Sequence, residues 1–175
     1  MRPKPIIIAI VGESGSGKTS LSMFLQERAN IPAIVSYTTR PMREGEQHGV
    51  DHFFVTHSQV PEPCDTFAYT VFGEHEYWTR ESQFRGYRIV SYVVDEKGLL
   101  EMLERWSESY TIVSVLIQRP DNPVEESRRL RDRGRIHISP ESYDAVIVNN
   151  GTEKDFHRQA IFKIGNLVSR NWSWE

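Results

Sequence analysis

The chain has 175 residues, 38% of them hydrophobic, which is enough for one domain with its own core. Its formal net charge of −3 argues against a protein that binds nucleic acid through an overall positive charge. A single cysteine, Cys64, excludes an intrachain disulfide and favours a reducing compartment, so we expect a cytoplasmic protein.

The first predicted element is a buried parallel strand over residues 6–11, a run of six apolar and mostly β-branched residues. This run is too short for a signal peptide or a membrane span, and no later run is long enough either. We therefore expect no membrane association.

The next eight residues match the phosphate-binding pattern G-x-x-x-x-G-K-[ST]. They are Gly12, Glu13, Ser14, Gly15, Ser16, Gly17, Lys18 and Thr19. In this motif backbone N–H groups surround phosphate oxygens at the start of a helix, where the helix dipole favours negative charge. Lys18 is then expected to reach the β- and γ-phosphates of ATP, and the Thr19 hydroxyl to bind Mg²⁺.

An ordinary glycine- and serine-rich turn would show the same eight letters, but the flanking segments favour the phosphate-binding loop. A strand precedes it, and a predicted helix over residues 20–29 follows, with Leu21, Phe24 and Leu25 on one face. Asn30-Ile31-Pro32 ends this helix.

The following region is predicted to be a small, mostly-β lobe over residues 36–79. Strands are expected at residues 33–37 and 50–55, and a hairpin at residues 67–72 and 76–79. Between them, Arg40 and Arg43 lie in a polar segment without apolar periodicity. A guanidinium matches two phosphate oxygens at once, so the pair is a candidate for holding a second, phosphorylated substrate.

The remaining residues are predicted to continue an α/β core. The expected elements are a short helix at 80–85, strands at 88–94, 110–117 and 144–149, a helix capped by Asp95, an arginine-rich helix at 123–133, and a final helix capped by Thr152. The apolar face of the Asp95 helix is expected to be Leu99, Leu100, Leu103 and Trp106, and that of the final helix Phe156, Ala160, Ile164 and Leu167. Alternating strands and helices predict a parallel sheet covered by helices on both faces.

Residues 36–54 closely resemble the nucleotide-acceptor segment of guanylate kinases. The family pattern is approximately S-x-T-T-R-x-x-R-x-G-E-x-x-G-x-D-Y-x-F, and this chain departs from it only at His52, where the family has tyrosine. The resemblance continues more weakly through residues 71–73, 77–79, 95–98, 129–134 and 146–149. It implies a single domain over residues 1–175, with a core (1–35, 80–125 and 141–175), an acceptor-binding lobe (36–79) and a lid (126–140).

The resemblance also implies roles for individual residues. Ser36, Arg40, Arg43, His52 and Tyr77 would hold the acceptor's phosphate, Thr79 would face its base, and Asp95 would lie near the base and the metal-bound phosphates. Lid residues Arg131 and Arg133 would close over ATP, and Asn149 would contact adenine. The implied activity is transfer of the ATP γ-phosphoryl group, with Mg²⁺, to GMP or dGMP.

Two further departures leave the acceptor open. Phe67 stands where the family has the glutamate that reads guanine, so Glu74, Glu76 or Asp95 would have to supply a carboxylate. If none does, Phe67 and Trp78 would form a pocket that stacks bases with little discrimination. The implied lid, residues 126–140, is also shorter than is usual in the family. The alternatives are therefore a kinase with another phosphorylated acceptor, or a non-catalytic binding module of the guanylate-kinase type.

Overall fold

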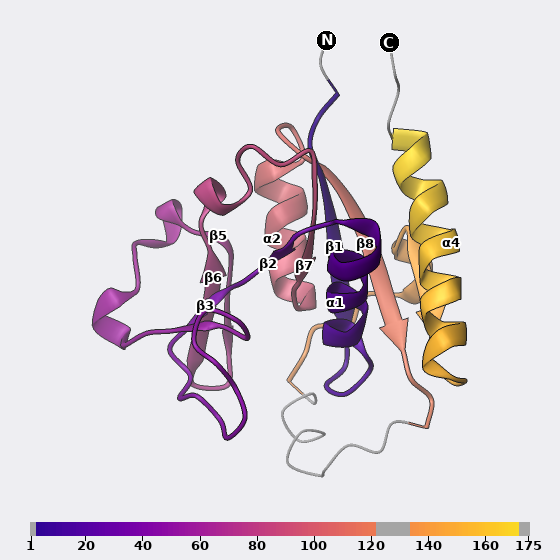
Figure 1. Ribbon diagram of the computed structural model, residues 1–175. Coiled ribbons are helices and arrows are strands. Elements are labelled where there is room, and N and C mark those ends of the chain that lie inside the picture. The colour runs from indigo at the N-terminus through magenta and orange to yellow at the C-terminus, as the bar shows by residue number, and fades with distance from the viewer. Residues whose placement is uncertain (1–2, 122–133, 172–175) are drawn as a thin grey trace.

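The computed structural model describes residues 3–121 and 134–171 and has two β-sheets, the larger of which carries the helices (Figure 1). The strands are β1 (Ile6–Gly12), β2 (Ala33–Ile34), β3 (Tyr37–Thr38), β4 (Phe53–Phe54), β5 (Phe67–Phe72), β6 (His75–Thr79), β7 (Ile89–Val93), β8 (Thr111–Gln118) and β9 (Ala145–Val148). The α-helices are α1 (Lys18–Ala29), α2 (Glu96–Trp106) and α4 (Glu153–Asn171). The arginine-rich helix predicted at 123–133 lies outside the described residues.

The larger sheet is parallel, as predicted, with the strand order β2-β7-β1-β8-β9. All seven residues of the central strand β1 are buried, because alternate side chains enter two different cores. Ile6, Ile8 and Ile10 pack with residues of α1 and α4, whereas Ile7 and Ala9 pack with residues of α2. Helices thus cover both faces, and the loop after β1 lies at the same edge of the sheet as the carboxyl end of β7 (Figure 1).

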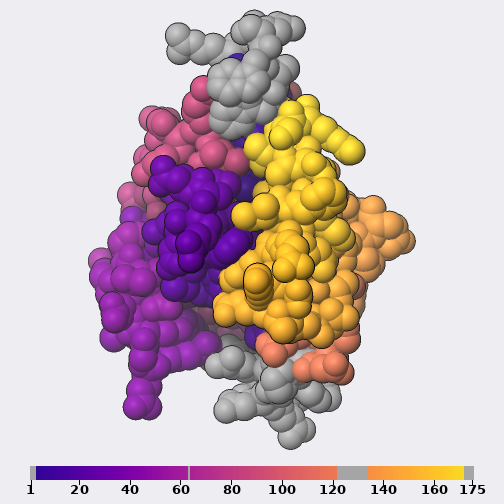
Figure 2. Space-filling view, turned by 45° about the vertical axis from the view of Figure 1, so that its right-hand side comes forward, coloured from indigo at the N-terminus to yellow at the C-terminus, as the bar shows by residue number. Residues whose placement is uncertain are grey.

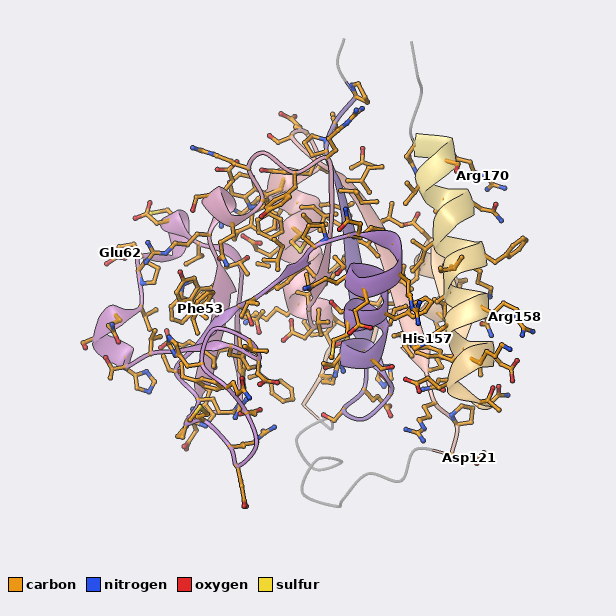
Figure 3. The ribbon with its side chains drawn as sticks, in the orientation of Figure 1. Phe53, Glu62, Asp121, His157, Arg158 and Arg170 are labelled. Atoms are coloured by element: carbon orange, nitrogen blue, oxygen red, sulfur yellow. The ribbon has the colours of Figure 1, made fainter. Side chains whose placement is uncertain are left out.

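The predicted apolar faces are confirmed in α1 and α4. In α1, Leu21 and Leu25 are buried. In α4, Phe156, Ala160 and Ile164 are buried, and the Thr152 hydroxyl accepts a hydrogen bond from the Asp155 N–H at 3.2 Å. Between these two helices, the side chain of His157 in α4 stacks on Phe24 of α1, with ring centroids 3.9 Å apart; His157 is labelled in Figure 3.

The predicted face of α2 is wrong at two positions. Leu100 and Leu103 are 44% and 40% exposed, while Leu99 and Met102 are buried against the sheet. Residues 99, 102 and 106 are spaced by three and four and share one helix face, and Leu100 and Leu103 lie on its flank. We assigned the face from its leucines and left out Met102, although methionine packs equally well in a core.

The second sheet has the order β4-β3-β6-β5 and forms the lobe beside the core. The single strand predicted at 33–37 is two strands, because the chain leaves the core sheet after β2 and enters the lobe sheet at β3. Where it crosses, the Gln83 side chain donates a hydrogen bond to the Val35 carbonyl at 2.8 Å. This bond links the segment that leaves the core for the lobe to the segment that returns from the lobe to the core.

Other lobe elements are shorter than predicted. The strand expected at 50–55 is reduced to β4, and the helix expected at 80–85 is a 3-10 turn, Glu81–Gln83. The predicted hairpin is confirmed, but β5 contains a bulge between Phe67 and Thr70, where Ala68 has a φ of 54°. None of the helices in the described part of the chain combines the length and apolar composition needed to cross a bilayer.

Candidate active site

The loop after β1 has the backbone geometry that its glycines predict. Gly17 has a φ of 113°, and a Cβ there would lie 2.8 Å from the Asn149 side-chain nitrogen. The Asn149 amide donates to the Ser16 carbonyl at 2.9 Å, so the residue that directly follows β9 supports the loop from the side. The Lys18 ammonium donates to the carbonyl oxygens of Gly12 and Glu13, at 2.7 and 2.8 Å. The cation is thereby held within the loop.

Across the cavity, Glu46 holds Arg40 in a fixed orientation. The two guanidinium nitrogens of Arg40 donate to the two Glu46 carboxylate oxygens at 2.9 and 2.8 Å, and one also donates to the Pro41 carbonyl. Burial alone would lower the pKa of Arg40, but the hydrogen bond and the charge of Glu46 outweigh it and raise the pKa. Arg40 is therefore a permanent cation with only 7% of its surface exposed.

His52 is hydrogen-bonded to Ser36, with 2.8 Å between the imidazole Nδ1 and the hydroxyl oxygen. Burial, together with the positive charge of Arg40, lowers the pKa of His52 to about 4. The imidazole is consequently neutral at pH 7. A neutral ring keeps one N–H donor, so His52 retains the hydrogen-bonding capacity, though not the shape, of the tyrosine that the resemblance led us to expect.

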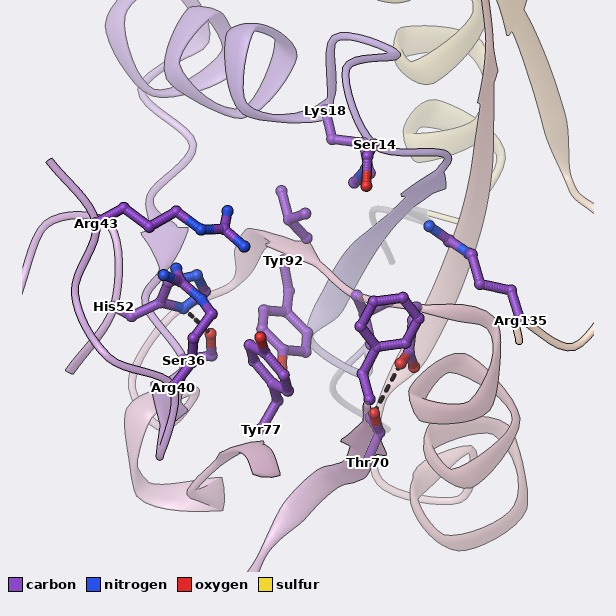
Figure 4. A pocket seen from close by; sticks show the side chains of 14 residues that line it. Ser14, Lys18, Ser36, Arg40, Arg43, His52, Thr70, Tyr77, Tyr92 and Arg135 are labelled. Atoms are coloured by element: carbon purple, nitrogen blue, oxygen red, sulfur yellow. Dashed lines mark hydrogen bonds between the residues drawn. The ribbon is translucent and has the colours of Figure 1, made fainter. Parts of the chain in front are cut away.

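These groups line a cavity of about 230 Å³ between the loop and the lobe (Figure 4). Eight of its lining residues were predicted from the sequence: Ser14, Lys18, Ser36, Arg40, Arg43, His52, Tyr77 and Asp95. In Figure 4, Lys18 and Ser14 lie on one side, Arg40 and Arg43 on another, and the Arg43 side chain extends into the space between them. The arrangement suits two anionic groups brought together from opposite sides.

At the far end of the cavity, Asp95 lies beside three residues that were not expected there. Thr70, Phe72 and Tyr92 line it together with Asp95. Asp95 caps α2 by accepting a hydrogen bond from the Gly98 N–H at 2.7 Å, and its other oxygen accepts from the Thr70 hydroxyl, also at 2.7 Å. Asp95 is thus both a helix cap and a wall of the cavity.

The expectation that Phe67 and Trp78 line a base-stacking pocket is wrong. Both side chains are fully buried, and Phe67 stacks on Phe84 within the core at a ring-centroid distance of 4.3 Å. Thr79 is also fully buried and donates its hydroxyl to the Phe67 carbonyl at 2.9 Å, so it does not line this cavity. The bulge in β5 explains the shift, because it changes which residues of the strand face the cavity.

Neither of the two other candidate carboxylates reaches the cavity. Glu76 accepts a hydrogen bond from the Tyr69 hydroxyl at 2.7 Å and contacts His57 at 3.0 Å, whereas Glu74 is exposed in the hairpin turn. Among the described residues that line the cavity, Asp95 is the one acidic side chain.

The remaining predicted residues lie in or near the adjoining open groove, or outside the described part. Thr19 lines this wider groove of about 680 Å³ between α1 and the lobe. Residues 3–121 and 134–171 contain no group of three or more His, Cys, Asp or Glu side chains arranged for a metal. Arg131 and Arg133 lie outside the described residues.

Sequence reasoning missed one charged residue of the cavity, Arg135. Its Nε donates to a carboxylate oxygen of Glu96, the first residue of α2, at 2.8 Å, and both side chains are nearly buried, at 11% and 12% exposure. Arg135 lies in a segment with several other arginines, and nothing in that sequence distinguishes it from its neighbours. Thr70 was missed because the bulge is not apparent from the sequence.

Comparisons with known proteins agree with this geometry. A sequence model of the family described as guanylate kinase matches residues 2–81. A guanylate kinase of Saccharophagus degradans is 31% identical over 175 residues, covering 95% of this chain and 82% of the relative. One from Chlorobium chlorochromatii is 28% identical, covering 86% and 90%. The crystal structure of guanylate kinase from Anaplasma phagocytophilum has the same fold, with a TM-score of 0.66, 23% identity, and coverage of 94% of this chain and 87% of that one.

Proposed function

The chain belongs to the guanylate kinase family, and we propose that it transfers the γ-phosphoryl group of ATP to GMP or dGMP. The observation that carries this proposal is a cavity lined both by Lys18 of the phosphate-binding loop and by Arg40 and Arg43 of the lobe. Two sets of cations facing one space suit a donor and an acceptor that both carry phosphate.

In the proposed reaction an oxygen of the acceptor's phosphate attacks the γ-phosphorus in line, and the bond from that phosphorus to the β-bridging oxygen breaks to release ADP. The attacking oxygen is already anionic, so no general base is needed, and catalysis consists of positioning and charge neutralisation. The loop residues Gly12 to Thr19 would hold the donor. Ser36, Arg40, Arg43, His52 and Tyr77 in the lobe of residues 36–79 would hold the acceptor's phosphate.

We also propose Mg²⁺ as the metal that accompanies ATP. The Thr19 hydroxyl lies next to Lys18 in the first turn of α1, and the described residues offer no protein cage for a metal. This donor set suits Mg²⁺, which keeps several waters and binds largely through substrate phosphates. Bound in this way, the ion would neutralise charge on the β- and γ-phosphate oxygens. Thr19 would hold and orient it.

The contacts of Asn149 with adenine, and those of Arg131 and Arg133 with the ATP phosphates, remain predictions. Asp95, with Thr70, is the proposed contact for the base, because it contributes the cavity's described carboxylate. Guanine presents N–H donors that a carboxylate can accept, and unpaired donors would be costly. We further propose a cytoplasmic location, which the single exposed cysteine supports.

A coupled assay with ATP and a panel of GMP, dGMP, AMP and a phosphorylated sugar tests this function. We expect GMP and dGMP to be phosphorylated in preference to AMP by at least about tenfold, the scale of one charge-assisted hydrogen bond. Lys18→Ala is the matched negative control and should lower turnover by roughly 10²–10³-fold while the fold persists. Phosphorylation of the sugar alone would point to another acceptor. Binding of ATP with no turnover on any acceptor would favour a binding module.

A further inference from the structure

We propose that Arg135 is a further catalytic residue, which contacts the transferring phosphoryl group, and that Glu96 is the residue that positions it. This inference rests on the proposed function, because it assigns a role within the same cavity. Arg135 belongs to the described part of the chain, and the proposal does not involve residues 122–133.

The balance of charge in the cavity is the first observation. Its described lining carries four permanent cations, Lys18, Arg40, Arg43 and Arg135, and one carboxylate, Asp95. Glu46 and Glu96 pair with Arg40 and Arg135 from outside this lining, so the groups that face the cavity stay predominantly positive. The cavity therefore suits a second anionic group beside the acceptor's monophosphate.

The position of Arg135 identifies that group. In Figure 4, Arg135 lies across the cavity from Arg43, on the side of Ser14 in the phosphate-binding loop. Arg43 and Arg135 therefore approach the space from opposite directions, with Lys18 between them. A phosphoryl group that moves from the loop toward the lobe must pass through this space, where charge spreads over its equatorial oxygens.

The anchoring of Arg135 shows that this position belongs to the folded core. Its Nε is fixed by Glu96, whose backbone begins α2 directly after Asp95. The chain that follows Arg135 is attached to the same core, because Ile138 is partly buried there and Tyr143 is buried. An arginine held in this way is preorganised and does not have to be ordered when the substrates bind.

The test compares wild type with the double variant Arg135→Gln/Glu96→Gln, which keeps a hydrogen-bonding pair and avoids an unpaired buried carboxylate. We expect kcat to fall by roughly 10²-fold, with the KM for GMP changed by less than about threefold. In direct titrations, wild type should prefer ATP to ADP, and the variant should lose that preference because only ATP carries the γ-phosphoryl group. The titrations need no turnover.

Arg105→Gln is the matched control, since Arg105 is also paired with a glutamate of α2, Glu101, but does not line the cavity. It should keep wild-type turnover. Wild-type kcat and an intact ATP preference in the folded double variant would overturn the proposal. If the double variant does not fold, Arg135→Lys replaces it. That variant should lose at least about tenfold in kcat because the guanidinium fork is gone, and full activity would overturn the assignment.

The two proposals fail in distinguishable ways. A wild-type protein that phosphorylates none of the monophosphates would refute the proposed function. Loss of the ATP preference in the double variant would then still support the contact between Arg135 and the γ-phosphoryl group.

Discussion

At the scale of single residues, the acceptor side of the cavity depends on how Arg40 is held. Two guanidinium nitrogens of Arg40 donate hydrogen bonds to Glu46, and the centre of the Phe54 ring lies 5.5 Å from the guanidinium carbon. The side chain therefore has one orientation before any substrate arrives. The hydrogen bond from Arg40 also lowers the pKa of Glu46 against the opposing effect of burial, so both partners stay charged at neutral pH.

We predict that Arg40→Lys lowers kcat/KM for the acceptor by roughly 10–100-fold, the range of one or two lost charge-assisted hydrogen bonds. An ammonium keeps the charge but cannot bind Glu46 and a phosphate with a planar fork. Steady-state kinetics with varied GMP measure the effect. Arg85→Lys serves as the control, because Arg85 is 74% exposed and pairs only locally with Glu81. Equal losses in both variants would contradict the role of the fork.

The sequence predicted the residues that lie in short, contiguous motifs. The phosphate-binding loop and the segment with Arg40 and Arg43 each keep their functional groups within a few positions of one another. Thr70 and Arg135 could not be found in this way, because their places depend on a bulge in one strand and on an ion pair across 39 positions of the chain. Tertiary contacts of that kind leave no local signature.

At the scale of elements, helix α2 is fitted closely to the lobe and the sheet. A Cβ added at Gly98 would lie 2.5 Å from a methyl group of Val94 and 3.0 Å from one of Thr70. Valine and threonine are β-branched, so neither methyl group moves easily away. Gly98 thus allows the first turn of α2 to approach the same threonine that Asp95 holds.

We predict that Gly98→Ala and Gly165→Ala change stability in opposite directions. Alanine favours a helix over glycine by roughly 0.5–1 kcal/mol, and Gly165 in α4 has no atom within 4 Å of the added Cβ, so Gly165→Ala should stabilise by about that amount. At Gly98 the overlap should cost about 1–3 kcal/mol and outweigh this gain. Urea unfolding of both variants measures the two signs. A stabilised Gly98→Ala would show that α2 has room to move.

The elements themselves were mostly predictable, and the division of residues 33–37 into two strands is an exception with a clear cause. Apolar runs and hydrophobic periodicity located β1, β5, α1 and α4, whereas residues 33–37 gave one predicted strand where the structure has two. Periodicity reports that a segment is extended but not which sheet it joins. The division between core and lobe is decided by pairing partners far away in the sequence, such as Ser91 for Ala33 and Trp78 for Tyr37.

At the scale of the whole molecule, His52 makes stability depend on pH. Its folded-state pKa is about 4, below the usual value of 6.5, so between these values the unfolded chain binds a proton that the folded protein excludes. The free energy of unfolding should therefore be highest above pH 6.5 from this group and fall as the pH drops toward 4, by on the order of 3 kcal/mol.

Denaturant unfolding at several pH values between 4 and 7 checks this prediction. His52→Tyr lacks the titrating ring, so its stability should decline less steeply than that of wild type over this range. His57→Gln is the control, because the His57 side chain is 68% exposed. Parallel curves for wild type and His52→Tyr would show that another group causes the acid sensitivity.

The hydrogen bond between Gln83 and Val35 has a mechanical consequence for the molecule. Figure 2 shows the lobe (residues 36–79) and the core side by side in one surface, yet the chain crosses between them only twice, and this bond fastens the two crossings together. The lobe is also attached along β5, where the Thr70 hydroxyl donates to Asp95 and the Ala68 N–H donates to Glu101 of α2. A rotation of the whole lobe about Val35 would have to break these contacts with α2. We therefore expect Arg40 and Arg43 to keep their mutual spacing, and any approach to the phosphate-binding loop to come from the part of the lobe beyond β5.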